Sequence, residues 1–164
     1  MTDALTFLCH HEAAHAAVAH HFRLRLSAVW VNPATDNGQT ELSAPEQTRL
    51  QHALILAAGA GAQRILDPER AALRIAATMD FIKLRNLVSE RKNKRLFGKR
   101  PDEEVEQLRE RIDMRIIACS RRLVFNHWLA VAQLAREPRT RHRIEGPEAE
   151  TILAGTGNGQ EKPA

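Results

Sequence analysis

The sequence predicts a mainly α-helical protein, a helical bundle-like domain with one small β-ribbon. The composition is 43% apolar but only 4% aromatic, without tyrosine, and it is rich in Ala, Leu and Arg, which favours packed helices over sheets. Apolar residues recur at spacings of three and four along most of the chain, which is typical of helices. Only residues 26–42 have the pattern of two short strands joined by a turn. At 164 residues the chain is most simply one domain, residues 1–154, with a flexible tail at 155–164.

The first helix is expected from Leu5 to Phe22, a run that contains no Pro or Gly and is rich in Ala. Four of its residues share one face at spacings of three and four: Leu8, His11, His15 and Val18. The two histidines are therefore expected to face inward. Cys9 lies well round the helix from this face, so we expect a buried structural thiol there rather than a ligand.

A short strand is expected from Leu26 to Val31, where the residues alternate and include β-branched side chains. The turn cluster at 36–38 follows, and Gln39 to Leu42 is expected to return as the partner strand.

A second helix is expected from Pro45 to Leu66. Gly59 and Gly61 lie in its middle, and each glycine costs a helix up to ~1 kcal/mol relative to Ala. The small-residue tract predicts close approach of another helix, and a flexible loop is the alternative.

A third helix is expected after Asp67 as N-cap and Pro68 as the first helical residue, continuing to Lys92 with a break near residues 77–78. Asp80 stands out because its neighbours are mostly apolar. A carboxylate forced inside would need a partner or a metal; a helix cap or a surface position is equally consistent with the spacing.

A basic linker at 93–101 precedes the longest expected helix, from Asp102 as N-cap to Glu137. His127 and Trp128 lie on this helix and are expected to pack in the core. A last short helix is expected from Pro147 to Leu153.

Composition narrows the function classes. The chain contains no run of 18 apolar residues and no recognisable signal peptide. We therefore expect no membrane segment and a cytoplasmic location. Two cysteines without a C-x-x-C pair fit a reducing compartment. The net charge is +4, but the basic residues are mostly interspersed with Glu. Only Arg91 to Arg100 is densely basic, so nucleic-acid binding is not expected.

The residues that indicate chemistry form the pattern H-E-x-x-H from His11 to His15. On a helix the two imidazoles lie one turn apart on the same face and can hold one tetrahedral Zn²⁺. Glu12 lies one position round the helix and is then placed to act on a water at the metal. A histidine-rich solvated face or an adventitious metal site is the alternative, because five of the eight histidines crowd into this segment.

The order of features resembles the peptidase domain of FtsH-type zinc metalloproteases, over roughly residues 4–154. The resemblance rests on four segments in order: CHHEAAHAAVA, AVWVNPATDNGQTEL, LILAAGAGAQRIL and TMDFIKL. Asp80 falls where the family's motif places its third zinc ligand, 21 residues after Gly59. Ala14 and Met79 depart from the Gly and Asn of the family motifs, and the family's ATPase module and membrane anchor are absent from the sequence.

The resemblance implies a zinc-dependent endopeptidase in which His11, His15 and Asp80 bind Zn²⁺ and Glu12 is the general base. It would hydrolyse unfolded or flexible polypeptides without ATP, or with a separate unfoldase as partner. Substrate is expected to add to the ribbon at 29–31 as an edge strand. The family's sixfold rings imply that a homo-oligomer could form. The alternative is a catalytically weak peptidase fold used for binding or regulation, with a structural zinc.

Overall fold

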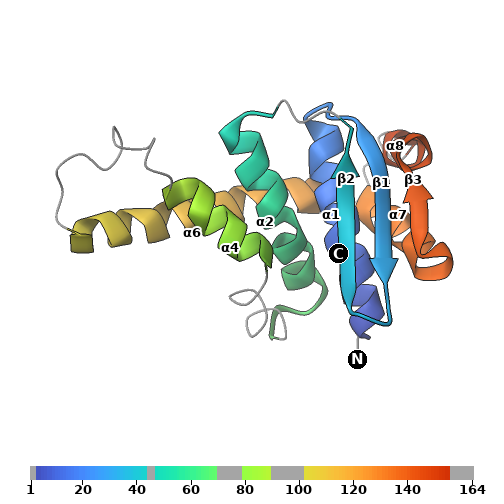
Figure 1. Ribbon diagram of the computed structural model, residues 1–164, viewed down its shortest axis with the longest axis horizontal. Helices are drawn as coiled ribbons and strands as arrows, with labels where there is room; N and C mark the ends of the chain where they lie inside the picture. The colour runs from blue at the N-terminus through green and yellow to red at the C-terminus, as the bar shows by residue number, and fades with distance from the viewer. Residues whose placement is uncertain (1–2, 44–46, 70–78, 90–101, 156–164) are drawn as a thin grey trace.

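The structure is a computed structural model that describes residues 3–43, 47–69, 79–89 and 102–155 (Figure 1). Over these residues the chain forms six helices and one small antiparallel sheet, which confirms the predicted mainly α class. The elements in chain order are α1 (Ala4–His21), β1 (Leu26–Asn32), β2 (Asn37–Leu42), α2 (Arg49–Leu66), α4 (Met79–Ser89), α6 (Asp102–Asn126), α7 (Trp128–Arg141), β3 (Arg143–Glu145) and α8 (Gly146–Gly155).

Helix α1 lies at the centre of the fold. Its ends differ by one residue each from the predicted helix, Leu5 to Phe22. Asp3 caps it, because the Asp3 carboxylate accepts a hydrogen bond from the Thr6 N–H at 2.7 Å. The helix packs against α2, α7 and the sheet, and its alanines between positions 13 and 19 are almost fully buried. Small side chains on several sides let all these neighbours approach one helix closely, which is why an Ala-rich run can serve as the core element.

The sheet has three strands in the order β2-β1-β3, so the prediction of a two-stranded ribbon was incomplete. Strand β3 pairs antiparallel with β1, with Ile144 opposite Val29. Since β1 is hydrogen-bonded on both sides, the expectation that substrate adds at residues 29–31 is wrong for this strand. The free edge belongs to β2, which pairs in the described sheet with β1 alone.

Helix α2 begins at Arg49, later than the predicted start at Pro45. Thr48 and Gln51 form a capping box, in which each side chain accepts a hydrogen bond from the other residue's backbone N–H. Asp67 ends α2 in an extended conformation, and residues 68–69 are helical again. The break predicted near 77–78 lies outside the described residues.

The predicted close packing of the small-residue tract is confirmed. A Cβ at Gly59 would lie 2.3 Å from the His11 ring, and a Cβ at Gly61 would lie 3.2 Å from the Cα of Arg121. Gly59 therefore lets α2 approach α1, and Gly61 lets it approach α6. Ser120 on α6 adds a buried hydrogen bond, since its hydroxyl donates to the Leu54 carbonyl at 2.7 Å.

The prediction of a single helix from 102 to 137 is wrong, because the helix is interrupted at His127 and forms two helices, α6 and α7. Trp128 packs against the main core as predicted, whereas His127 is only half-buried. The final helix α8 matches its prediction within two residues at each end. The basic linker at 93–101, the basic run at 91–100 and the tail beyond 155 lie outside the described residues.

Two larger hydrophobic clusters, beside a small contact of Ala60 with Phe81, hold the described part of the molecule together. The main core lies between α1, the sheet, α2, α7 and α8. The second cluster joins α4 to α2 and α6 around the fully buried Leu84, on the side of the molecule where α6 extends to the left in Figure 1. This second cluster fixes where the first turn of α4, and with it Asp80, lies relative to α1. Among the helices that the structure describes, none is long and apolar enough to cross a membrane.

Candidate metal centre

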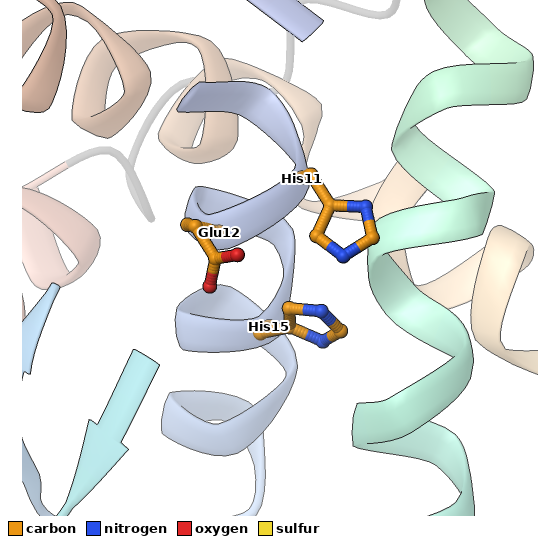
Figure 2. Close-up of side chains that lie close together, drawn as sticks. All are labelled: His11, Glu12 and His15. Atoms are coloured by element: carbon orange, nitrogen blue, oxygen red, sulfur yellow. The ribbon is translucent and has the colours of Figure 1, made fainter. Parts of the chain in front are cut away.

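His11 and His15 lie one turn apart on α1, and both imidazole rings are directed toward α2 (Figure 2). Their ring centroids are 4.6 Å apart, and the two residues are 8% and 6% exposed. Glu12 is 5% exposed, and its carboxylate lies in front of α1, to the left of the two rings in the same view. One donor atom from each of the three residues lies within 4.8 Å of the others. The inward orientation predicted for the two histidines is confirmed.

Asp80, in the first turn of α4, reaches both histidines. Its Oδ2 lies 2.9 Å from Nε2 of His11 and 3.1 Å from Nε2 of His15. The open question about Asp80 is therefore answered in favour of a half-buried carboxylate with two specific partners, not a surface residue. Its other oxygen, Oδ1, lies 3.9 Å from Nζ of Lys83.

The orientation of His15 is fixed from its far side. Its Nδ1 lies 2.6 Å from the backbone oxygen of Ile55, so the Nδ1–H donates to that carbonyl and Nε2 is turned toward Asp80. Such a hydrogen bond from the distal nitrogen is the usual way in which a protein orients a metal-binding imidazole. Nothing in the sequence marks Ile55 for this role, because the acceptor is a main-chain atom.

The contacts around Asp80 shift two pKa values in opposite directions. Burial works against the charged form of His15, but the hydrogen bond with Asp80 and the charges of Glu12 and Asp80 outweigh it and raise the pKa of His15 to about 9. Burial likewise works against the charged form of Asp80. The hydrogen bonds from His11 and His15 outweigh that effect and hold the pKa of Asp80 well below its usual range. Without a metal, an ion pair therefore occupies the centre of the site.

His11 is positioned by the shape of α2 instead of by a hydrogen bond from its distal nitrogen. Its ring fills the space that a side chain at Gly59 would occupy, and its buried Nδ1 has no hydrogen-bond partner among the described residues. Gly59 is thus part of the site, a role that the sequence predicted only as general helix packing.

Glu12 is held by strand β2, through two residues that no motif in the sequence marks. The Thr40 Oγ1 lies 2.8 Å from the backbone oxygen of Glu12 and 3.2 Å from its Oε2, so the hydroxyl can donate to either. A Cβ at Gly38 would lie 2.8 Å from the Glu12 Cγ. In the sequence Gly38 and Thr40 belong only to the predicted turn and strand, and nothing there predicts that they contact Glu12 on α1.

These groups line an open cleft with a volume of about 910 Å³. Its walls come from the N-terminal half of α1, from β2 and the turn before it, from α2 and from the start of α4. The residues His11, Glu12, His15 and Asp80 all line this one cleft.

The donor set suits a zinc-like ion. Two imidazole nitrogens and one carboxylate oxygen are typical zinc ligands at about 2.0–2.2 Å, which places neighbouring ligand atoms roughly 3.3 Å apart. The Asp80 oxygen is already within 0.4 Å of that spacing from both Nε2 atoms, at 2.9 and 3.1 Å. Glu12 also lies near the histidines, but its carboxylate is hydrogen-bonded to Thr40. Asp80 is accordingly the better candidate for the oxygen ligand, which leaves the Glu12 carboxylate free of the metal.

Cys9 does not belong to the site. It is 1% exposed within the main core, and burial raises the pKa of its thiol to about 11. The expectation of a buried structural thiol is confirmed.

When the chain is compared with known proteins, no family model matches it, and no curated protein matches it.

Proposed function

We propose that this protein is a zinc-dependent endopeptidase whose site resembles that of FtsH-type peptidase domains. His11, His15 and Asp80 would hold the metal, and Glu12 would act as general base. The observation that carries the proposal is that Asp80 meets both histidines, although it lies 69 residues after His11 and 65 after His15. Its carboxylate oxygen is 2.9 Å from the first imidazole and 3.1 Å from the second. A solvated histidine-rich face would not bury these side chains around one shared acceptor.

The roles of the protein groups follow from their contacts. When bound, zinc supplies Lewis-acid activation of a water molecule and of the peptide carbonyl. Glu12 accepts the proton of the attacking water, because its carboxylate faces the cleft and is not paired with either histidine in the contacts described above. The same carboxyl can then deliver that proton to the leaving amine. Ile55 and Gly59 orient the two imidazoles.

The substrate we propose is a flexible or unfolded polypeptide. Strand β2 borders the cleft, and β1 is its one strand partner among the described residues. The main-chain groups of its other edge can pair with an extended peptide irrespective of the peptide's sequence. Chain that is held in helices or inside sheets does not offer its main-chain groups in this way. The chain would act without ATP by itself, or on segments opened by a separate unfoldase.

Location and assembly belong to the same proposal. Cys9 and Cys119 are both free, and free thiols persist in a reducing compartment, so we place the protein in the cytoplasm. By analogy with the family it resembles, it could assemble into a homo-oligomer.

The test compares the wild-type chain with Glu12→Gln, using metal analysis and a fluorogenic peptide library. We expect one zinc per chain in both proteins, and about 10²-fold or greater loss of hydrolysis in the variant, as for removal of a general base. Glu104→Gln, an exposed residue of α6, is the matched control and should retain full activity. Wild-type protein without stoichiometric zinc would overturn the proposal. Zinc with no hydrolysis would favour the alternative of a structural zinc in a binding or regulatory protein.

A further inference from the structure

A second pair of histidines meets at the far end of α1, outside the cleft. The Nδ1 of His21 and the Nε2 of His127 are 3.0 Å apart, and the ring centroids are 5.1 Å apart with the rings tilted by 59°. The residues are separated by 106 positions in the sequence. His21 follows His15 by six residues, about 9 Å along the helix axis, so this pair is distinct from the candidate metal centre.

The helix break at His127 turns this imidazole toward α1. The break contains neither Gly nor Pro, and His127 departs from helical geometry with φ −108° and ψ 19°. Its side chain makes no capping hydrogen bond to α7. Its ring points instead to His21, which belongs to the last turn of α1. A continuous helix, which the apolar spacing predicts, is interrupted at the residue that makes this contact.

The C-terminal end of α1 is a favourable place for a bound cation. The pair lies at the C-terminus of α1, where the helix dipole is negative. Burial, together with the charges of His21 and His20, lowers the pKa of His127, which favours the neutral ring that a metal ion requires. His21 is exposed and His127 is half-buried, so water can complete the coordination of an ion held by two imidazoles.

We propose that His21 Nδ1 and His127 Nε2 form a second metal site, which binds a transition-metal ion that prefers imidazole, such as Ni²⁺, Cu²⁺ or Zn²⁺. Imidazole suits these ions, and two nitrogens 3.0 Å apart are close to the roughly 3.3 Å that separates two ligands of one ion. In the metal-free chain a hydrogen bond between the two rings holds them together. The bound ion replaces that hydrogen bond and cross-links α1 to the junction of α6 and α7.

The experiment titrates the full chain with Ni²⁺ by isothermal titration calorimetry, with metal analysis of the bound fraction. The test variants are His21→Gln and His127→Gln, because the Gln amide can keep a hydrogen bond to the remaining imidazole but is a poor ligand for Ni²⁺. The matched control is His142→Asn, which removes a different exposed histidine at a left-handed position that Asn tolerates.

Besides any Ni²⁺ bound at the candidate metal centre, which all four proteins share, we expect a Ni²⁺-binding event in the wild type and in His142→Asn. Both Gln variants should weaken this event by about tenfold or more, since losing a ligand costs at least as much as losing a residue that orients a ligand. Retention of helical circular dichroism in the Gln variants separates ligand loss from misfolding. The proposal is overturned if either Gln variant binds Ni²⁺ as the wild type does, or if His142→Asn loses as much affinity as the Gln variants.

Discussion

At the scale of single residues, the candidate site depends on the absence of a side chain at Gly59 as much as on the candidate ligands themselves. The His11 ring occupies the volume of an absent side chain on α2, with ring atoms 2.3–2.4 Å from where a Cβ would lie. Helix α2 accepts a glycine at this position, at a cost of up to ~1 kcal/mol relative to Ala, because the imidazole fills the gap. The glycine therefore sets the orientation of a candidate ligand.

Replacing Gly59 with Ala is expected to displace the His11 ring and to lower zinc affinity at least about tenfold. Overpacking of this kind costs about 1–3 kcal/mol, which outweighs the gain in helix propensity. The zinc content after dialysis measures the change in zinc affinity, and unfolding in urea measures the change in stability. Gly61→Ala is the matched control on the same helix. It meets Arg121 on α6, away from the site, and should keep its zinc. Equal zinc loss in both variants would mean that α2 packing in general, and not the His11 contact, matters.

The sequence identified the site residues that a motif or an ordered set of motifs can mark. His11, Glu12 and His15 follow from helical spacing, and Asp80 required the order of four segments because a lone Asp among apolar residues is also consistent with a cap. Thr40 was beyond prediction, because its contact with Glu12 depends on how β2 lies across α1.

At the scale of elements, β2 has two roles in the same cleft. It forms the free edge of the sheet, and its Thr40 hydroxyl reaches both the main chain and the carboxylate of Glu12. Two features of the fold were not predicted, because neither has a local signal in the sequence. Strand β3 is three residues long with one apolar side chain, and the α6–α7 break contains no Gly or Pro. Both are imposed by tertiary contacts, which sequence periodicity does not encode.

Thr40→Val is expected to lower kcat about tenfold while KM and zinc content stay unchanged, because the change removes a group that orients Glu12 without touching a ligand. Val suits a strand and has nearly the shape of Thr, so the fold should be retained. Thr40→Ser keeps the hydroxyl and should recover most of the activity. Steady-state kinetics on a fluorogenic peptide provide the measurement. A Ser variant as impaired as the Val variant would assign the effect to packing instead of the hydrogen bond.

At the scale of the whole molecule, the site joins parts of the fold that have separate cores. Helix α1 belongs to the main core, whereas Asp80 is placed by the second cluster around Leu84. Without metal, the contacts of Asp80 with His11 and His15 already connect the two parts. A metal at this point would strengthen a connection that exists, and would not create the fold.

Removal of zinc with EDTA is therefore expected to lower the stability of the protein without unfolding it. At a free zinc concentration 100 times Kd, binding contributes about 2.7 kcal/mol. For a chain of this length that corresponds to a fall in Tm of roughly 5–10 °C on chelation. Thermal denaturation followed by circular dichroism measures the shift, and the helical signal at 25 °C should be unchanged. His15→Ala should show a low Tm that no longer responds to EDTA, because the site is lost in both conditions. Collapse of the helical signal on chelation at 25 °C would instead mean that the metal, and not the two hydrophobic clusters, holds α4 against α1.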